Sequence, residues 1–356
     1  MKYCLFHPII TLALSLFAIG AQANSPQDIL PDTSENRARV AAAYEQYLNI
    51  DREHGRFIEV NGIKMHYLEW GDDSGVPLIW SHGYSSTGFE LVNVADQLVE
   101  AGYHVYSISY RGHGHTQVDN YEFSLAHIAD DIAAMMDKLG IEKAVIGGLS
   151  LGGGVTTTFY ENYPERVLGI VLEDGGADAV QLRTEIMYEQ MKAMLEHMPA
   201  MQMPVFQDRF AGIKFMANLY VPGWGGEFPK LSMVALHSFV VEKKDGTFGM
   251  HHDDAKMFDA FGEAAINPGL THRLPLLHQS WRRVHPYITY RNLSVPMVII
   301  DPTGDLFDAT GSFEKLRDMH PDLITLVDYP NTPHAAHPMR PEWFVRDLEA
   351  LLERIK

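Results

Sequence analysis

Short apolar segments alternate with amphipathic ones along much of this chain, and that alternation leaves few folds open. Runs such as 77–81 and 144–147 are shorter than most helices, and they lack the polar face of a half-exposed strand. Such runs are typical of strands buried on both faces of a parallel sheet. The segments between them carry helical periodicity. We therefore expect an α/β fold with a mostly parallel sheet and helices on both of its faces.

The expected elements follow residues 24–33, which have the character of a flexible leader. An antiparallel hairpin, 56–60 and 63–70, is indicated by Asn61-Gly62, a strong signal for a two-residue turn. Further strands are expected at 77–81, 104–110, 144–147, 167–172, 297–300 and 323–328, and helices at 34–48, 89–100, 124–139, 151–160, 311–319 and 342–355.

The alternation stops near Asp174 and resumes near Pro296. The long segment between them has helical rather than strand character, and we expect a lid inserted after the sixth strand, over the sheet edge where ligands bind in such folds. The predicted organisation is a signal peptide at 1–23, a leader and helix at 24–55, a core at 56–175 and 292–356, and a helical lid at 176–291.

Two features of the predicted lid have more than one interpretation. Its methionines recur at helical spacing, so they either pack the lid onto the core or line an acyl pocket. A glycine-rich loop around Trp224 is a candidate hinge. The methionines are Met187, Met191, Met194, Met198 and Met201.

The amino-terminal segment predicts export. Lys2 precedes an apolar run that ends in Ala21-Gln22-Ala23, which is typical of a secretory signal with a cleavage site before Asn24. The run is shorter than the roughly 18 to 20 residues of a membrane span, so we expect a periplasmic or secreted protein without a stable membrane anchor.

Composition narrows the function classes. Cys4 is the only cysteine and lies within the predicted signal, so disulfides, thiolate catalysis and cysteine-ligated metals are excluded from the mature chain. The formal net charge of −18 makes nucleic acid a poor partner. We expect a small-molecule substrate with an apolar part and no cofactor.

The pentapeptide Gly148-Leu149-Ser150-Leu151-Gly152 follows an apolar run and precedes a helical segment. A serine at such a strand-to-helix turn projects its hydroxyl, and the flanking glycines remove side chains that would clash there. The N–H groups at the start of the helix favour negative charge at the same place. This context predicts that Ser150 is a nucleophile.

A serine nucleophile needs a base and an acid. His334 follows the last expected strand, and the carboxyl ends of parallel strands share one edge of a sheet. His337 is the nearest rival, but it precedes a proline and more plausibly supports the loop. Asp305 follows the preceding strand and is our candidate acid. Asp301, Asp308 and Asp174 remain open as alternatives.

The oxyanion of an acyl-transfer reaction needs two N–H donors. The amide of Leu151 is one candidate. The second is the amide of Tyr84, with His82 and Gly83 supporting its loop after the third expected strand.

Together these residues resemble the α/β-hydrolases of the lidded serine esterase and lipase type. The resemblance implies the order nucleophile, acid, histidine at Ser150, Asp305 and His334. It also argues against the haloalkane dehalogenases and epoxide hydrolases of this fold, which place aspartate at the nucleophile position. Similar landmarks are His82-Gly83, the 111–116 loop and Pro341-Glu342, whereas Pro333 and Asp301-Pro302 depart from the family pattern.

The rival signals are weaker. His113 and His115 suggest a metal pair, but Gln117 and Val118 stand where a metallo-β-lactamase motif needs Asp and His. The run 251–254 is more typical of a solvated turn. We expect a carboxylesterase without a metal. Lactone, amide or carbon–carbon bond hydrolysis by the same residues and a ligand-binding protein on the same fold are the alternatives.

Overall fold

A computed structural model of the chain describes residues 28–84, 86–177, 204–220, 228–250, 267–303 and 310–356, together with residues 185, 189 and 192. The predicted signal segment, the methionine stripe, the Trp224 loop and the 251–254 run lie outside this range. Within the described residues, no helix combines the length and apolar character that crossing a bilayer requires.

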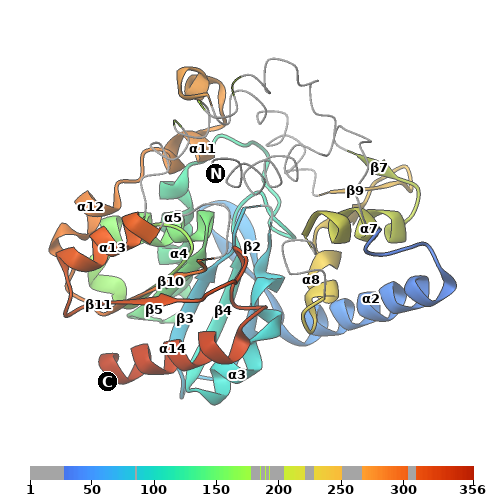
Figure 1. The fold of residues 1–356 in the computed structure, drawn as a ribbon. Coiled ribbons are helices and arrows are strands. Elements are labelled where there is room, and N and C mark those ends of the chain that lie inside the picture. The colour runs from blue at the N-terminus through green and yellow to red at the C-terminus, as the bar shows by residue number, and fades with distance from the viewer. Residues whose placement is uncertain are drawn as a thin grey trace, which may run out of the picture.

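The main sheet has eight strands in the order β1-β2-β4-β3-β5-β6-β10-β11 (Figure 1). β2 pairs antiparallel with β1 and with β4, and every later pair in this order is parallel, as predicted. The strands are β1 (Gly55–Val60), β2 (Ile63–Trp70), β3 (Val76–Ser81), β4 (Tyr103–Ser109), β5 (Ala144–Leu149), β6 (Val167–Glu173), β10 (Met297–Asp301) and β11 (Ile324–Asp328).

The predicted hairpin turn is confirmed. Asn61 and Gly62 join β1 to β2 with φ of 45° and 79°. Left-handed backbone at both central positions is the requirement of a type I′ turn, which asparagine and glycine meet at low cost.

Helices cover both faces of the sheet (Figure 1). One apolar cluster joins the sheet to α4, α5 and α13, and a second joins it to α3 and α14. These helices are α3 (Ala95–Glu100), α4 (Leu125–Leu139), α5 (Leu151–Asn162), α13 (Thr310–Met319) and α14 (Pro341–Ile355). The predicted 89–100 helix divides into a 3-10 turn, Gly88–Asn93, and α3. Gly140, at φ 72°, ends α4 as expected.

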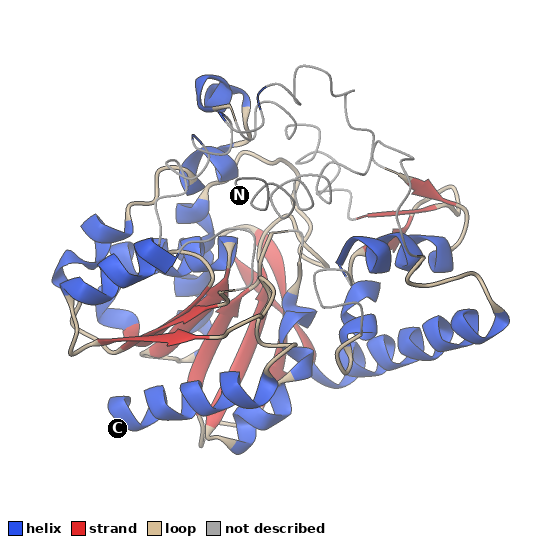
Figure 2. Ribbon diagram, viewed as in Figure 1, coloured by secondary structure: helices blue, strands red, loops and turns tan. Residues whose placement is uncertain are grey.

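The insertion after β6 contains helices, as predicted, and also a small sheet that the sequence did not indicate (Figure 2). Its strands are two or three residues long, which is too short to display an alternating pattern. The described elements are α7 (Arg209–Tyr220), α8 (Ser232–His237), α11 (Leu276–Trp281) and α12 (Pro286–Thr289), with β7 (Val205–Phe206), β8 (Val240–Glu242) and β9 (Phe248–Met250) in the order β7-β9-β8.

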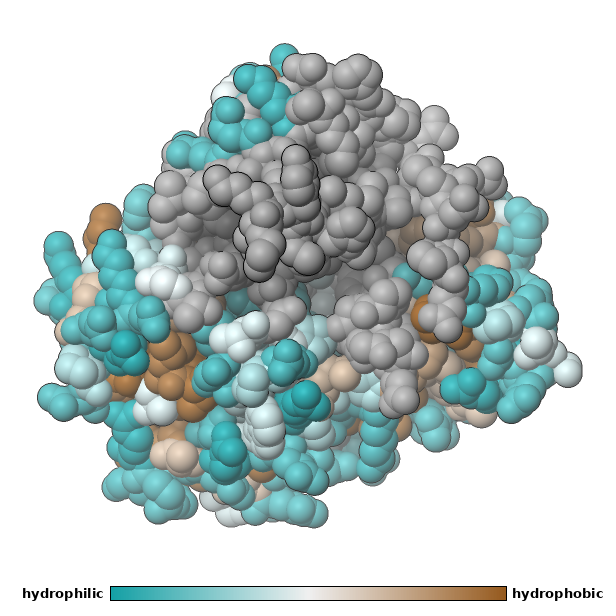
Figure 3. Space-filling model, viewed as in Figure 1, coloured by the Kyte–Doolittle hydropathy of each residue, from teal (hydrophilic) through white to brown (hydrophobic). Residues whose placement is uncertain are grey.

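The segment before the hairpin is more ordered than its composition suggested. Helix α2 runs from Ser34 to His54, six residues past its predicted end, and it contacts both the core and the insertion. Leu30 in the preceding leader is fully buried in a cluster with α7 and α8, and Asn218 accepts a hydrogen bond from the Ile29 amide at 3.0 Å. The leader was expected to be flexible because tertiary contacts of this kind are not visible in local sequence. On the face shown in Figure 3 the described residues are mostly hydrophilic, in keeping with 46 acidic and 28 basic residues.

His237 is buried where α8 meets α2. Its Nε2–H donates to the Val40 carbonyl at 3.1 Å, and its ring packs 5.2 Å from that of Tyr44. Burial, assisted by the charge of Arg209, lowers the pKa of His237 to about 3. The folded protein therefore excludes a proton that the unfolded chain binds below a pH of about 6.5.

Stability should consequently fall as the pH falls from about 6.5 toward 3, and this histidine alone should cost about 2 kcal/mol at pH 5. In His237→Gln the amide keeps a donor for Val40 but does not titrate. Denaturant unfolding at pH 8 and pH 5 should show the smaller loss on acidification in His237→Gln. Equal losses in the two proteins would contradict the assignment.

Candidate active site

Ser150 occupies a sharp turn between β5 and α5. Its backbone has φ 55° and ψ −113°, a conformation that a residue with a side chain adopts only when its surroundings enforce it. The Ser150 amide donates to the Glu173 carbonyl at 2.9 Å. A Cβ on Gly148 would overlap the Gly152 backbone, and one on Gly152 would overlap the Ser81 carbonyl. The glycines of the pentapeptide are therefore required by close backbone packing.

His334 and Asp174 form a short hydrogen bond. His334 lies in the loop between β11 and α14, and its Nδ1 is 2.6 Å from Oδ2 of Asp174, the residue that follows β6. The Asp174 side chain is 1% exposed and that of His334 is 31% exposed. Because the carboxylate accepts, the proton lies on Nδ1 and Nε2 is the basic nitrogen of the ring.

The backbone brings this pair to Ser150. Asp174 has φ 42°, and its amide donates to the Ile300 carbonyl at 3.1 Å, which holds it at the end of the sheet. The next residue, Gly175, packs so closely on the Ser150 backbone that a Cβ would overlap it. Ser150, Asp174 and His334 thus share the carboxyl edge of the parallel strands.

The structure describes two of the candidate acids, Asp301 and Asp174, and not the other two. Asp305 and Asp308 lie outside the described residues, so their assignments stay predictions. Asp301 is still a residue of β10, and its carbonyl accepts the Tyr329 amide at 2.8 Å. In the described part of the chain, Asp174 is the carboxylate bonded to His334. The Gly175-Gly176 pair that follows Asp174 was the one feature of the sequence that could have singled out this acid.

The loop after β3 is held by side chains that bond to both the carbonyl and the amide of Gly83. His82 Nδ1 and Tyr110 Oη donate to the Gly83 carbonyl at 2.7 and 3.3 Å, and their rings stack 3.8 Å apart. The Gly83 amide donates to Glu90 Oε2 at 2.9 Å, so it is already used within the loop.

In a trans peptide the carbonyl and the following N–H point in opposite directions. Fixing the Gly83 carbonyl therefore fixes the direction of the Tyr84 amide, the predicted oxyanion donor. Leu151 is the first residue of α5, where helix amides have no partner within the helix. Sequence reasoning did not identify Tyr110 and Glu90, because their roles depend on how the end of β4 and the Gly88–Asn93 turn pack against the loop after β3.

Comparison with known proteins identifies the fold that carries this site. Residues 76–215 match a family model described as the alpha/beta hydrolase fold. The solved structure of E-2-(acetamidomethylene)succinate hydrolase superposes with a TM-score of 0.64 at 18% identity, covering 84% of this chain and 98% of that one. The chain has the α/β-hydrolase fold.

Curated relatives match this chain over shorter stretches. Bifunctional epoxide hydrolase 2 of Sus scrofa is 29% identical over 119 residues, 33% of this chain and 21% of its own. The bifunctional esterase/perhydrolase of Acinetobacter calcoaceticus is 28% identical over 127 residues, 35% of this chain and 45% of its own. These matches span less than half of either relative.

The histidine pair of the sequence analysis, His113 and His115, has protein partners. His113 Nδ1 lies 3.3 Å from the Arg111 carbonyl, and burial lowers its pKa to about 4. His115 Nε2 lies 3.0 Å from Tyr47 Oη. The described residues contain no group of three or more side chains arranged to hold a metal.

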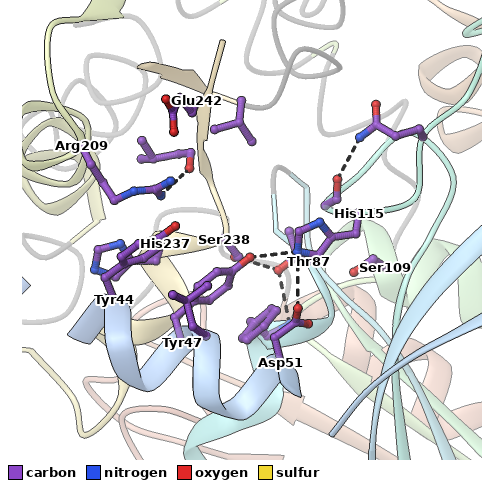
Figure 4. A pocket seen from close by; sticks show the side chains of 16 residues that line it. Tyr44, Tyr47, Asp51, Thr87, Ser109, His115, Arg209, His237, Ser238 and Glu242 are labelled. Carbon is purple, nitrogen blue, oxygen red and sulfur yellow. Dashed lines mark hydrogen bonds and ion pairs between the residues drawn. The ribbon is translucent and has the colours of Figure 1, made fainter. Parts of the chain in front are cut away.

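A cavity of about 240 Å³ lies between α2, the loop after β4 and the insertion (Figure 4). Tyr47, Asp51, His115 and Arg209 contribute polar groups to its wall. Ser150, Asp174 and His334 are not among its lining residues, so it is distinct from the candidate catalytic centre.

Proposed function

We propose that this chain is an exported serine hydrolase that cleaves carboxylic esters through an acyl-enzyme. The observation that carries the proposal is the 2.6 Å bond between His334 Nδ1 and Asp174, formed beside a serine on a strained strand-to-helix turn. Nucleophile, base and acid meet at one sheet edge, next to two candidate oxyanion donors.

In the proposed reaction His334 Nε2 removes the Ser150 hydroxyl proton as Oγ attacks the substrate carbonyl. Asp174 holds the imidazole in the required tautomer and stabilises its charged form. The amides of Tyr84 and Leu151 donate to the oxyanion, and each such donor contributes about 2.7–4 kcal/mol to lowering the barrier. The protonated histidine then protonates the leaving alcohol, and water releases the acid by the same steps.

The substrate class is the less constrained part of the proposal. One relative is an epoxide hydrolase, but a serine at the nucleophile position supports acyl transfer and not epoxide opening. The relative that is an esterase favours an ester as the substrate. Lactone, amide and carbon–carbon bond hydrolysis use the same residues and form the second candidate. Export rests on the predicted signal segment.

A fluorophosphonate probe tests the nucleophile, because it reacts with an activated serine and not with a passive binding site. We expect one label per chain, located by mass spectrometry on Ser150 and absent from Ser150→Ala. Ser312→Ala, on α13, is the control and should label as the natural chain does. Labelling of Ser150→Ala would show that the nucleophile is misassigned, and absence of labelling in the natural chain would favour the ligand-binding alternative.

A substrate panel tests the ester assignment. p-Nitrophenyl butyrate, the matching p-nitroanilide and a γ-lactone should be hydrolysed in that order of kcat/KM. Faster turnover of the anilide or the lactone would replace esterase by amidase or lactonase and leave the catalytic residues unchanged.

A further inference from the structure

Glu173, immediately before Asp174, is fully buried and holds the loop that carries His334. Its Oε1 accepts the Ala336 amide at 2.6 Å and the His337 amide at 2.8 Å. Its main-chain carbonyl accepts the Ser150 amide. One residue thus bonds to the nucleophile through its backbone and to the histidine loop through its side chain.

His337 continues this set of contacts. Its Nδ1 lies 2.9 Å from Glu173 Oε2, and its Nε2 lies 3.0 Å from the Glu90 carbonyl. A carbonyl oxygen only accepts, and Glu173 already accepts two amides as a carboxylate does. Both ring nitrogens therefore carry protons, and the ring is an imidazolium. The ring is 1% exposed, and the charges of Glu173 and Glu90 raise its pKa against the opposing effect of burial.

Glu90 reaches the oxyanion loop from the other side of His337. Its two carboxylate oxygens accept from Gly83 N and Trp80 Nε1, each at 2.9 Å. It is partly buried, and burial raises its pKa above the usual value against the opposing charge of His337. The Gly83 bond holds the peptide immediately before the one that presents the Tyr84 amide.

We propose that the Glu173–His337–Glu90 array, with a charged His337 at its centre, aligns the base and the oxyanion loop with each other. Glu173 and Glu90 are then positioning residues: they act through His334 and Tyr84 and do not contact the reacting atoms. The inference rests on the proposed function, because it assigns these partners to that catalytic site.

The charge of His337 is testable without any substrate. In the full chain with 15N-labelled histidine, long-range 1H–15N spectra at pH 7.5 should show one histidine with both nitrogens protonated, and that signal should vanish in His337→Gln. A neutral His337 at this pH would overturn the central part of the proposal.

Kinetics test the positioning roles. In Glu173→Gln the new amide N–H group faces an N–H donor of the His337 loop or ring. In Glu90→Gln it faces the Gly83 amide or Trp80 Nε1–H, so each variant loses one hydrogen bond. We expect each variant to lower kcat by about 10–100-fold, the size expected of a slight misplacement, with KM changed less than about threefold. Because both act through one array, the double variant should lose no more than the worse single variant, whereas independent sites would multiply their losses.

Glu69→Gln provides the matched control. Glu69 Oε1 pairs with the buried His104 at 3.1 Å on β2 and β4, so its replacement breaks a glutamate–histidine contact elsewhere in the same sheet. This variant should keep kcat within about twofold of the natural value. Multiplying losses in the double variant, or natural kcat in Glu173→Gln, would overturn the proposal.

The two proposals fail differently. If the proposed serine chemistry is wrong, the natural chain will not label at Ser150 and the array will have no catalytic site to align. If only this inference is wrong, labelling at Ser150 will persist and Glu173→Gln and Glu90→Gln will turn over normally. Should Glu173→Gln not fold, as judged by circular dichroism, Glu90→Gln and the His337 spectrum decide the question.

Discussion

Replacing Asp174 by asparagine should reduce kcat by about 10⁴-fold with little change in KM. The asparagine has nearly the same shape, but its amide can donate to Nδ1 and so stabilises the tautomer with the proton on Nε2. That tautomer cannot accept the Ser150 proton. The acid is almost fully buried, so water cannot take its place. Stopped-flow or steady-state hydrolysis of a p-nitrophenyl ester measures the effect.

The same measurement on Asp305→Asn and Asp301→Asn separates the candidate acids. Because the single N–H at Nδ1 of His334 already donates to Asp174, neither Asp305 nor Asp301 is needed as its acceptor. Both variants should therefore retain kcat within about tenfold of the natural value. Natural activity in Asp174→Asn together with its loss in Asp305→Asn would instead make Asp305 the acid, as the family resemblance implied.

Gly152→Ala should prevent stable folding. The added methyl would overlap the Ser81 carbonyl and lie 2.7 Å from the His82 carbonyl, and both are main-chain atoms at the end of a buried strand. Side chains can rotate away from such a clash, but these atoms cannot move without separating β3 from α5. We expect a loss of about 4 kcal/mol or more, in the range reserved for severe overpacking.

Gly311→Ala is the control for that substitution. Gly311 lies in α13, and nothing lies within 4 Å of a Cβ placed there. The alanine should leave stability unchanged or raise it by up to about 1 kcal/mol, because it favours the helix. Thermal unfolding of both variants measures the contrast, and equal melting temperatures would show that the elbow has room for a side chain.

The features that sequence predicted well have local causes. The Asn61-Gly62 turn and the end of α4 at Gly140 each follow from backbone requirements within a few residues. The glycines around Ser150 form a short motif that local sequence displays, although they pack on the distant Ser81. The parallel sheet followed from a pattern repeated along the chain. His334 was placed near Ser150 by topology alone, since both follow strands that end at the same edge.

The features that sequence left open depend on distant contacts. β6 and β10 are neighbours in the sheet, so an acid after either strand lies near His334, and pattern alone cannot choose between Asp174 and Asp305. The bond that favours Asp174 joins residues 160 positions apart, and the His337–Glu90 contact spans 247. Such contacts exist only once the tertiary fold has formed.

Helix α2 connects helices α7 and α8 of the insertion to the main sheet. It contacts β2 of the main sheet as well as α7 and α8 of the insertion. Arg37 near its start pairs with Asp208 just before α7 at 3.0 Å. Leu30 completes the same cluster. Any outward swing of α7 and α8 must therefore carry α2 with it or expose a closed apolar cluster. The segment before the hairpin, Leu30 included, limits how α7 and α8 can move relative to the sheet.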